Sequence, residues 1–356
     1  MNTHPFLTGL QDNPDFLLQN LDFQNQSGLI VKIDERAYRQ ASFLDERVFS
    51  TDTQGAWFPF QTLLEATTGL TIQKAPHFIF HIGHCGSTLI SRLLGELPET
   101  FSLREPIAPL ALAVIRREMG ADNAPLDMET WRRLFAMSLT SLSRTYNIND
   151  RPIIKLTSAA GNLLEPVLQA NAASKALLLY VDLETWLAIM LRAEATRENL
   201  HAYSGVWLKD FQRLTGRDDI QLQALDDTRQ AVISWLTMML SFQLADKRYP
   251  GRTQWLNFDD FLLHTTEHLA SISEFFGLQL STQQSQELPS SPLLRSYSKI
   301  PTQAFNPGLR TQELQEAQTQ FHDEIQKGLR WAEELCRDTP ALDQTRRYLH
   351  NDDKIA

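Results

Sequence analysis

Cysteine is scarce in this sequence: only Cys85 and Cys336 occur among 356 residues. Two thiols cannot build a disulfide framework, and we therefore expect the protein to work in a reducing compartment. Long apolar runs are also missing. The first residues do not combine a basic region with an apolar stretch, and no later window resembles a membrane span. These absences predict a cytoplasmic location and no membrane partner.

Positive charge is in deficit, since 33 lysines and arginines face 43 aspartates and glutamates and leave a formal net charge of −10. A protein that binds nucleic acid needs a basic face, so we expect no nucleic-acid partner. The sequence has no H-E-x-x-H motif and no cluster of carboxylates with metal-ligand spacing, and no metal is expected. The oligomeric state is not predicted by any feature of the sequence.

The segment His77–Arg92, HFIFHIGHCGSTLISR, is the most informative part of the chain. An apolar burst at 78–82 predicts a buried strand, Gly83–Gly86 a small turn, and Ser87 with Thr88 the start of an amphipathic helix. The first amides of a helix lack intrahelical partners, and glycines let the backbone approach a ligand. This arrangement predicts an anion-binding cradle, for a phosphate or a sulfate ester.

The spacing within this segment disfavours two other anion sites. A nucleotide-triphosphatase loop has the form G-x-x-x-x-G-K-[ST], whereas Gly86 stands here in the place of the lysine before Ser87. A cysteine phosphatase loop has the form HC-x5-R, but six residues separate Cys85 from Arg92. The extra residue turns the arginine by about 100° on a helix. A strand–helix corner without any ligand remains an alternative.

Apolar runs alternate with helical patterns along the rest of the chain. We expect strands at 152–156, 175–181 and 253–258, a helix through 186–190, and further helices at 127–145, 225–247, 262–276 and 311–336. This alternation predicts βαβ units, and hence an α/β domain of the P-loop type, with a central parallel sheet between helices, at 76–340. Residues 1–75, with one expected strand at 27–33, are interpreted as a leader that packs on this core. Residues 341–356 are interpreted as a polar tail.

Five segments of this domain, in order along the chain, resemble motifs of the sulfotransferase family, whose donor is 3′-phosphoadenosine 5′-phosphosulfate (PAPS). The first resembles the 5′-phosphosulfate loop, which usually reads P-[KR]-[ST]-G-[ST]-[ST]. The segments are Gly83–Thr88, Leu103–Pro106, Lys155–Ser158, Gln254–Leu278 and Arg295–Lys299.

The resemblance implies a sulfotransferase-like enzyme that moves a sulfonate from PAPS to a hydroxyl or amine of a small-molecule or peptide acceptor. The 5′-phosphosulfate would be bound by the loop, that is by Gly83, His84, Cys85, Gly86, Ser87 and Thr88. Such a reaction chiefly needs hydrogen-bond donors aimed at the charge on the transferred group. The amides of the loop would supply them.

Three further side chains receive catalytic roles from the resemblance. Glu105 falls in the acidic segment and would serve as the base for the acceptor, with a structural carboxylate as the alternative. Lys155 would neutralise the donor phosphate or the leaving group, unless it is a solvated strand end. His84 stands where the family has a basic loop residue and could protonate the bridging oxygen, unless it is an ordinary loop histidine.

One strand departs from the family pattern. The strand at 177–181 is followed by Asp182 and Met190, where the family has the arginine and the serine that hold the 3′-phosphate. A carboxylate repels a phosphate, and more so in a partly dry pocket.

Three interpretations of Asp182 and Met190 at these positions stay open. Another cation takes the 3′-phosphate, the candidates being Arg192, Arg197, Lys299 and Arg310. Alternatively, Asp182 binds a ribose hydroxyl or a cationic substrate, and the donor differs from PAPS. In the third reading the chain is a catalytically inactive nucleotide- or anion-binding protein of the same fold. A phosphoryl-transfer P-loop protein is the other enzymatic alternative.

Overall fold

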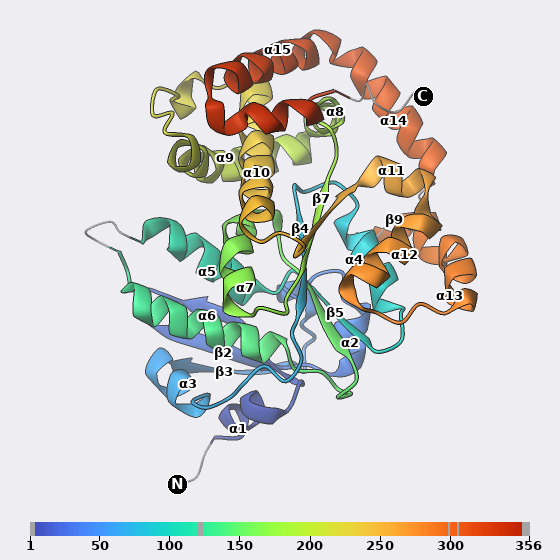
Figure 1. The fold of residues 1–356 in the computed structure, drawn as a ribbon. Coiled ribbons are helices and arrows are strands. Elements are labelled where there is room, and N and C mark those ends of the chain that lie inside the picture. Colours follow the sequence, from blue (N-terminus) through green and yellow to red (C-terminus); the bar gives the residue numbers. More distant parts are fainter. Residues whose placement is uncertain (1–3, 120–123, 298–299, 305, 351–356) are drawn as a thin grey trace. The chain divides into compact units, whose positions relative to one another are not determined.

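The computed structural model describes residues 4–119, 124–297, 300–304 and 306–350 (Figure 1). They form two compact units, each built from separate stretches of the chain. The first unit comprises Met1–Phe80, Ser87–Leu177 and Thr266–Leu293. The second comprises His81–Gly86, Leu178–Thr265 and Leu294–Ala356.

The protein is an α/β protein with a five-stranded parallel central sheet, as the sequence predicts. Its strand order is β5-β6-β4-β7-β8. The strands are β4 (His77–His81), β5 (Thr100–Arg104), β6 (Arg151–Lys155), β7 (Ala176–Tyr180) and β8 (Thr253–Asn257). All residues of β4 and β5 are buried, as in a parallel strand that is covered on both faces.

In the first unit, β6 lies between β4 and β5 and pairs in parallel with both. Helix α4 (Ser87–Gly95) follows β4 and is linked to β5 by a hydrogen bond of 2.8 Å between the hydroxyls of Ser91 and Ser102. The unit also holds α5 (Ile107–Glu118), α6 (Met128–Leu142), η2 (Ser158–Leu163), α7 (Leu164–Ala170), α12 (Thr265–Phe276), α13 (Thr282–Glu287) and η4 (Leu288–Ser290).

The first 75 residues contain more regular structure than the single expected strand. A three-stranded antiparallel sheet is formed by β1 (Phe16–Asp22), β2 (Ser27–Lys32) and β3 (Gln54–Pro59). The strand expected at 27–33 is confirmed as β2. Helices α1 (Pro5–Asp12), α2 (Glu35–Gln40), η1 (Glu46–Val48) and α3 (Phe60–Ala66) complete this region. Helices α5 and α6 pack against β1.

Two arginines, Arg104 (buried) and Arg144 (half-buried), attach this N-terminal region to the rest of the first unit through backbone carbonyls. Arg144 donates at 2.7–3.0 Å to the carbonyls of Gly9, Leu10, Asn13 and Phe16. The guanidinium of Arg104 donates to the carbonyls of Tyr38, Arg39 and Ala41 at the C-terminal end of α2. Burial lowers the pKa of each guanidinium to about 10, and the partly negative end of a helix is a suitable partner for a cation.

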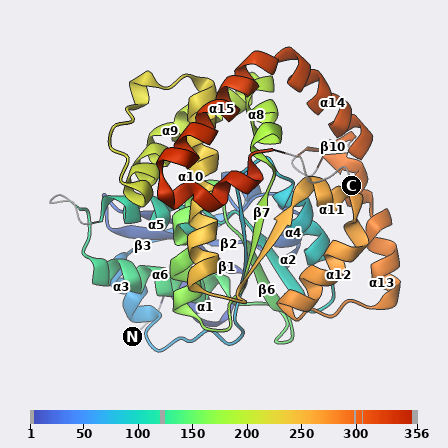
Figure 2. The ribbon, with the colours of Figure 1, turned by 45° about the horizontal axis from the view of Figure 1, so that its top comes forward.

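In the second unit, helices α8 (Leu183–Arg192), α9 (Glu194–Thr215) and α15 (His322–Asp338) all pack against α10 (Asp227–Arg248) (Figure 2). The buried indole of Trp235 in α10 donates to the carbonyl of Val181 at 2.9 Å and joins the helix to the end of β7. The remaining elements are η3 (Leu222–Ala224), α11 (Phe258–Leu263), η5 (Pro292–Arg295), β9 (Ser296–Tyr297), β10 (Ile300–Ala304), α14 (Pro307–Gln320) and η6 (Pro340–Tyr348).

Two predictions about helices need correction. The helix expected at 311–336 is two helices, α14 and α15, which are separated at Phe321. The helix expected at 262–276 is α12 preceded by the short α11, and it ends as predicted before Gly277, whose φ is +65°. Within the segment interpreted as a polar tail, Leu342, Thr345 and Leu349 are buried. Among the described residues, no helix has the length and apolarity to cross a membrane.

Candidate active site

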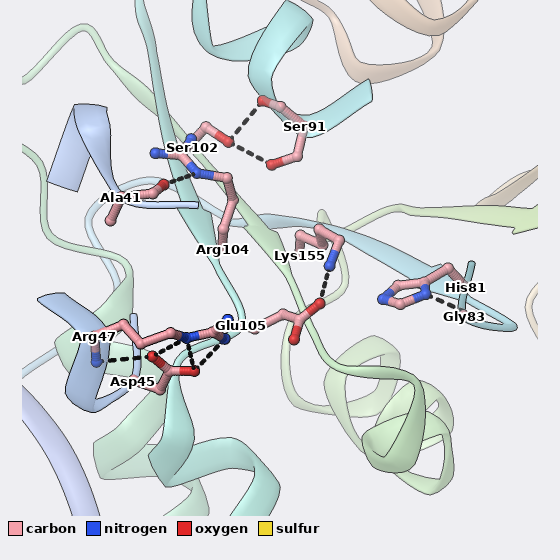
Figure 3. Close-up of polar contacts among 10 residues, drawn as sticks. All are labelled: Ala41, Asp45, Arg47, His81, Gly83, Ser91, Ser102, Arg104, Glu105 and Lys155. Atoms are coloured by element: carbon pink, nitrogen blue, oxygen red, sulfur yellow. Dashed lines mark hydrogen bonds and ion pairs between the residues drawn. The ribbon is translucent and has the colours of Figure 1, made fainter. Parts of the chain in front are cut away.

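The turn between β4 and α4 has an unusual backbone. Three of its four residues, Gly83, His84 and Gly86, have positive φ angles of 84°, 47° and 70°. The N–H of Gly83 is held by the Nδ1 atom of His81 at 2.9 Å (Figure 3). A right-handed residue next to a left-handed one turns successive N–H groups toward one side of the chain, which is the backbone arrangement of anion-binding nests.

The space next to Gly86 is filled by the protein itself. A Cβ atom on Gly86 would lie 1.9 Å from the Phe258 ring, so only glycine fits here. An aromatic ring therefore occupies the space that a side chain at position 86 would need. The guanidinium of Arg310 lies over the Phe258 ring, 5.1 Å from its centre. This distance is within cation–π range.

Cys85 and His84 differ in their surroundings. The Cys85 side chain is fully buried, and its Sγ donates to the carbonyl of Leu179 at 3.5 Å. His84 is half-buried, and its ring centre lies 6.4 Å from that of Trp186 in α8.

The hydroxyl of Thr88 is the feature of this segment that indicates a ligand-binding position. Ser87 and Thr88 are both buried at the start of α4. The Oγ1 atom of Thr88 is inaccessible and has no hydrogen-bond partner in the described part of the chain. Leaving a buried hydroxyl unsatisfied costs about 1–3 kcal/mol, and such atoms commonly mark an unfilled binding position. A phosphate or sulfate oxygen at the helix N-terminus would satisfy it.

The structure brings together two of the predicted catalytic residues, Glu105 and Lys155, in the first unit (Figure 3). The ammonium group of Lys155 is fully buried and forms an ion pair with Glu105, whose side chain is 22% exposed. The backbone joins them as well, since the N–H of Glu105 donates to the carbonyl of Lys155 at 2.7 Å. Lys155 is therefore not the solvated strand end that the alternative described.

Glu105 adopts a left-handed backbone with φ of +51° directly after β5. For a residue with a side chain this conformation costs roughly 1–3 kcal/mol, and such residues gather at active sites. The conformation and the ion pair together hold the carboxylate in one orientation.

Arg47 is a further charged residue of this region that the sequence analysis did not select. Arg104 donates at 2.6 Å to the carbonyl of Ala41, and the carbonyl of Arg104 accepts the N–H of Leu44 at 2.8 Å. These bonds fix the segment that carries Arg47 beside the end of β5 (Figure 3). Hydrogen bonding to Asp45 raises the pKa of Arg47, and the charge of Glu105 adds to this effect. No sequence motif contains Arg47, so only the fold could reveal it.

Asp182 is buried at the end of β7 and accepts a hydrogen bond from Nδ2 of Asn257 at 3.3 Å. Two of the cations proposed for a 3′-phosphate already have carboxylate partners. Arg192 pairs with Glu313 at 2.7 Å, and Arg310 pairs with Asp259 at 2.8 Å.

The remaining 3′-phosphate candidates are Arg197 and Lys299. The guanidinium of Arg197 lies 3.9 Å from Asp227. Lys299 lies outside the described residues.

The expectation that no metal is needed stays a prediction. Among the described residues, no group of three or more histidine, cysteine, aspartate or glutamate side chains is arranged to hold a metal. The predicted roles of the loop, of Glu105 and Lys155, and of Asp182 also stay predictions after the geometry is known.

The fold and the turn after β4 define a parallel α/β protein with a candidate anion site. No protein-family model matches the chain, and no curated protein matches it either. Among solved structures, a sulfotransferase domain from the curacin biosynthetic pathway is similar with 13% identity and a TM-score of 0.42. The match covers 70% of this chain and 98% of that one.

Two mycobacterial structures are similar at the same level. A sulfotransferase from Mycobacterium tuberculosis H37Rv has 14% identity and a TM-score of 0.41, with 69% of this chain and 77% of that chain covered. A sulfotransferase from Mycobacterium avium has 13% identity and a TM-score of 0.41, with 74% and 80% covered.

Proposed function

We propose that this protein is a sulfotransferase-like enzyme that binds the phosphosulfate end of a nucleotide donor at Gly83–Thr88. It transfers the sulfonate to a hydroxyl or amine of a small-molecule or peptide acceptor. The motif resemblance implies PAPS as the donor. One observation carries the proposal: the buried hydroxyl of Thr88 has no partner among the described residues, at a helix N-terminus that follows a turn with three left-handed residues.

The transfer breaks the bond between sulfur and the bridging oxygen of the phosphosulfate and forms a bond between sulfur and the acceptor atom. The proton of the acceptor passes to a base, for which Glu105 is the candidate. Lys155 orients the Glu105 carboxylate through the ion pair. His84, half-buried in the loop, is the candidate donor of a proton to the bridging oxygen. The loop amides and the Thr88 hydroxyl stabilise the charge on the peripheral oxygens.

A binding protein without catalytic activity is the second candidate function. It is favoured by the carboxylate of Asp182 at the end of β7 and by the carboxylate partners of Arg192 and Arg310. Both candidates predict nucleotide binding at the loop, and only the first predicts turnover. A cytoplasmic location is part of both proposals.

Thermal unfolding with ligands tests the proposed site. Adenosine 5′-monophosphate (AMP), adenosine 3′,5′-bisphosphate and Mg·ATP are each added at millimolar concentration. A ligand at about a hundred times its Kd adds about 2.7 kcal/mol of stability. We expect stabilisation by at least one of the two adenosine phosphates and a smaller effect of Mg·ATP. If neither adenosine phosphate shifts the transition, the proposal is wrong.

Thr88→Val is the informative variant, because valine keeps the shape of threonine and removes the hydroxyl. We expect the variant to bind the nucleotide at least tenfold more weakly while its unliganded form is as stable as the parent or more stable. Thr88→Ser, which keeps a hydroxyl, is the matched control and should bind nearly as the parent does. Equal binding by all three proteins would remove Thr88 from the site.

A further inference from the structure

Asp182 stands at a helix N-cap and does not cap the helix. An aspartate at this position normally accepts a hydrogen bond from an N–H group in the first turn. The first turn of α8 receives no such bond from Asp182, although the side chain is only 6% exposed. The carboxylate is directed instead toward Asn257 of β8. A helix cap therefore does not account for a buried carboxylate at this point.

Asn257 fixes the direction of this carboxylate. The Oδ1 atom of Asn257 accepts the N–H groups of Asp259 at 2.9 Å and Asp260 at 3.3 Å, and so caps α11. Because the oxygen is used in this way, the amide nitrogen of Asn257 is the atom that faces Asp182. Asn257 is thus a positioning residue, which presents an acceptor-only carboxylate at the ends of β7 and β8.

The loop His81–Gly86 lies along the same part of the second unit. The carbonyl of Leu179, three residues before Asp182, accepts the N–H of Ile82 at 3.2 Å and the Sγ–H of Cys85 at 3.5 Å. Trp186, one turn after Asp182, has its ring centre 6.4 Å from that of His84. A nucleotide whose 5′ end occupies the loop would therefore extend along the same unit toward Asp182, which follows Leu179 by three residues.

The charge of Asp182 favours a ribose hydroxyl of the nucleotide and opposes a second phosphate on the ribose. A carboxylate repels a phosphate dianion, and the repulsion is stronger where water is excluded. It accepts hydrogen bonds from ribose hydroxyls, as acidic residues do in dinucleotide sites. A phosphate directed to Arg192 or Arg310 would have to displace Glu313 or Asp259.

We infer that Asp182 accepts a hydrogen bond from a ribose hydroxyl and thereby selects 5′-phosphosulfates whose ribose carries no phosphate ester. The inference rests on the proposed function and narrows its donor: adenosine 5′-phosphosulfate is preferred over PAPS. Asp182 acts on the choice of donor, and it takes no part in the bond-making step.

The test compares the affinity of the full chain for AMP and for adenosine 3′,5′-bisphosphate by titration calorimetry. We expect the parent to bind AMP at least tenfold more tightly. Asp182→Asn, which has the same shape without the charge, should bind AMP more weakly and the bisphosphate more tightly, so that the preference disappears. 3′-Deoxy-AMP and 2′-deoxy-AMP identify the hydroxyl: one of them should lose affinity for the parent and not for the variant.

Controls separate this inference from the proposed function. Thr88→Val should weaken both nucleotides by the same factor and leave their ratio unchanged. Asp182→Ser provides a second uncharged variant in case the asparagine variant is misfolded, which circular dichroism would show. Tighter binding of the bisphosphate than of AMP by the parent, or an unchanged ratio in both Asp182 variants, overturns the inference while the proposed function stands. If neither nucleotide binds to the parent, both fail.

Discussion

Glu105 and Asp182 are acidic residues at comparable places in the two units, each close after a buried strand, and their surroundings differ. Glu105 has a left-handed backbone and an ion pair with a fully buried lysine. Asp182 has an extended backbone and a hydrogen bond from the neutral amide of Asn257. Under the proposed function, the carboxylate with a cationic partner would be held in one orientation for proton transfer. The carboxylate next to an amide would discriminate between ligand groups by charge.

The largest effect that would test this comparison is expected for Glu105→Gln. General-base catalysis contributes about 10²–10⁴-fold to the rate, so turnover should fall by that factor while nucleotide binding stays the same. Sulfonate transfer is measured with a radiolabelled donor and a panel of hydroxyl and amine acceptors. Asp182→Asn should instead change donor preference and keep a measurable rate.

Glu99→Gln is the matched control for this variant. Glu99 also has a positive φ, of 55°, and lies at the other end of β5, but its side chain is exposed. Its substitution should leave both turnover and binding unchanged. If the Glu105 and Glu99 variants are equally active, Glu105 is not the base, and the ion pair is structural.

Lys155→Met tests the same ion pair through stability. Removing one member of a buried pair usually costs about 3–5 kcal/mol. Because Glu105 is partly exposed, with 22% of its side chain accessible, we expect about 3 kcal/mol from urea unfolding.

The double variant Lys155→Met, Glu105→Gln completes a double-mutant cycle. It should recover part of the loss, since no uncompensated charge is then left. Additive losses would show that the two residues act independently, and the contrast with Asp182 would lose its physical basis.

The loss of folding stability at low pH sets the pH range in which the variants of both carboxylates can be studied. His77 is buried at the start of β4, where its Nδ1 accepts the N–H of Lys175 and its Nε2 donates to the carbonyl of Phe276. Burial, with a smaller contribution from the charge of Arg151, lowers the pKa of His77 to about 4.

Because the folded pKa lies below the unfolded value of about 6.5, the folded state binds fewer protons. The contribution of neutral His77 to the stability of the folded state is complete above pH 6.5 and is lost as the pH falls toward 4. At about 1.4 kcal/mol per pH unit the loss reaches about 3 kcal/mol. Urea unfolding of the parent and of His77→Gln between pH 4 and 8 measures it. The variant should show a flatter profile, whereas equal slopes would exclude His77 as the source.

The sequence was sufficient for the elements whose apolar pattern is continuous. The strands β6 and β7 and the helices α6, α8 and α10 occur where they were expected, since each buries a run of apolar residues. Strand β8 also occurs where it was expected, although Leu256 is its only buried residue. Strand β3 was not predicted because its residues are mostly exposed and show no continuous pattern. The break between α14 and α15 was missed because both halves have helical composition and only the fold separates them.

The candidate site shows a similar division. The turn at Gly83–Gly86 and the residues after it were recognisable because their spacing is local. The ion pair between Glu105 and Lys155 joins positions fifty residues apart, and no local pattern encodes it. Arg47 carries no motif at all. The need for glycine at position 86 arises from Phe258, a contact that depends on the tertiary structure.

The smallest effect on stability is expected for Gly86→Ala. This variant tests the loop near Asp182 without changing the ion pair of Glu105. Gly216→Ala is the matched control, because Gly216 has a φ of +72° and a Cβ atom added there would meet nothing within 4 Å. Both variants incur the left-handed strain, of roughly 1 kcal/mol for alanine. Only Gly86→Ala must also displace the Phe258 ring, and it should lose about 2 kcal/mol in total. It should also weaken AMP binding, whereas Gly216→Ala should not. Equal stability and equal binding of the two variants would mean that the loop adjusts freely around Phe258, and Gly86 would then not define its shape.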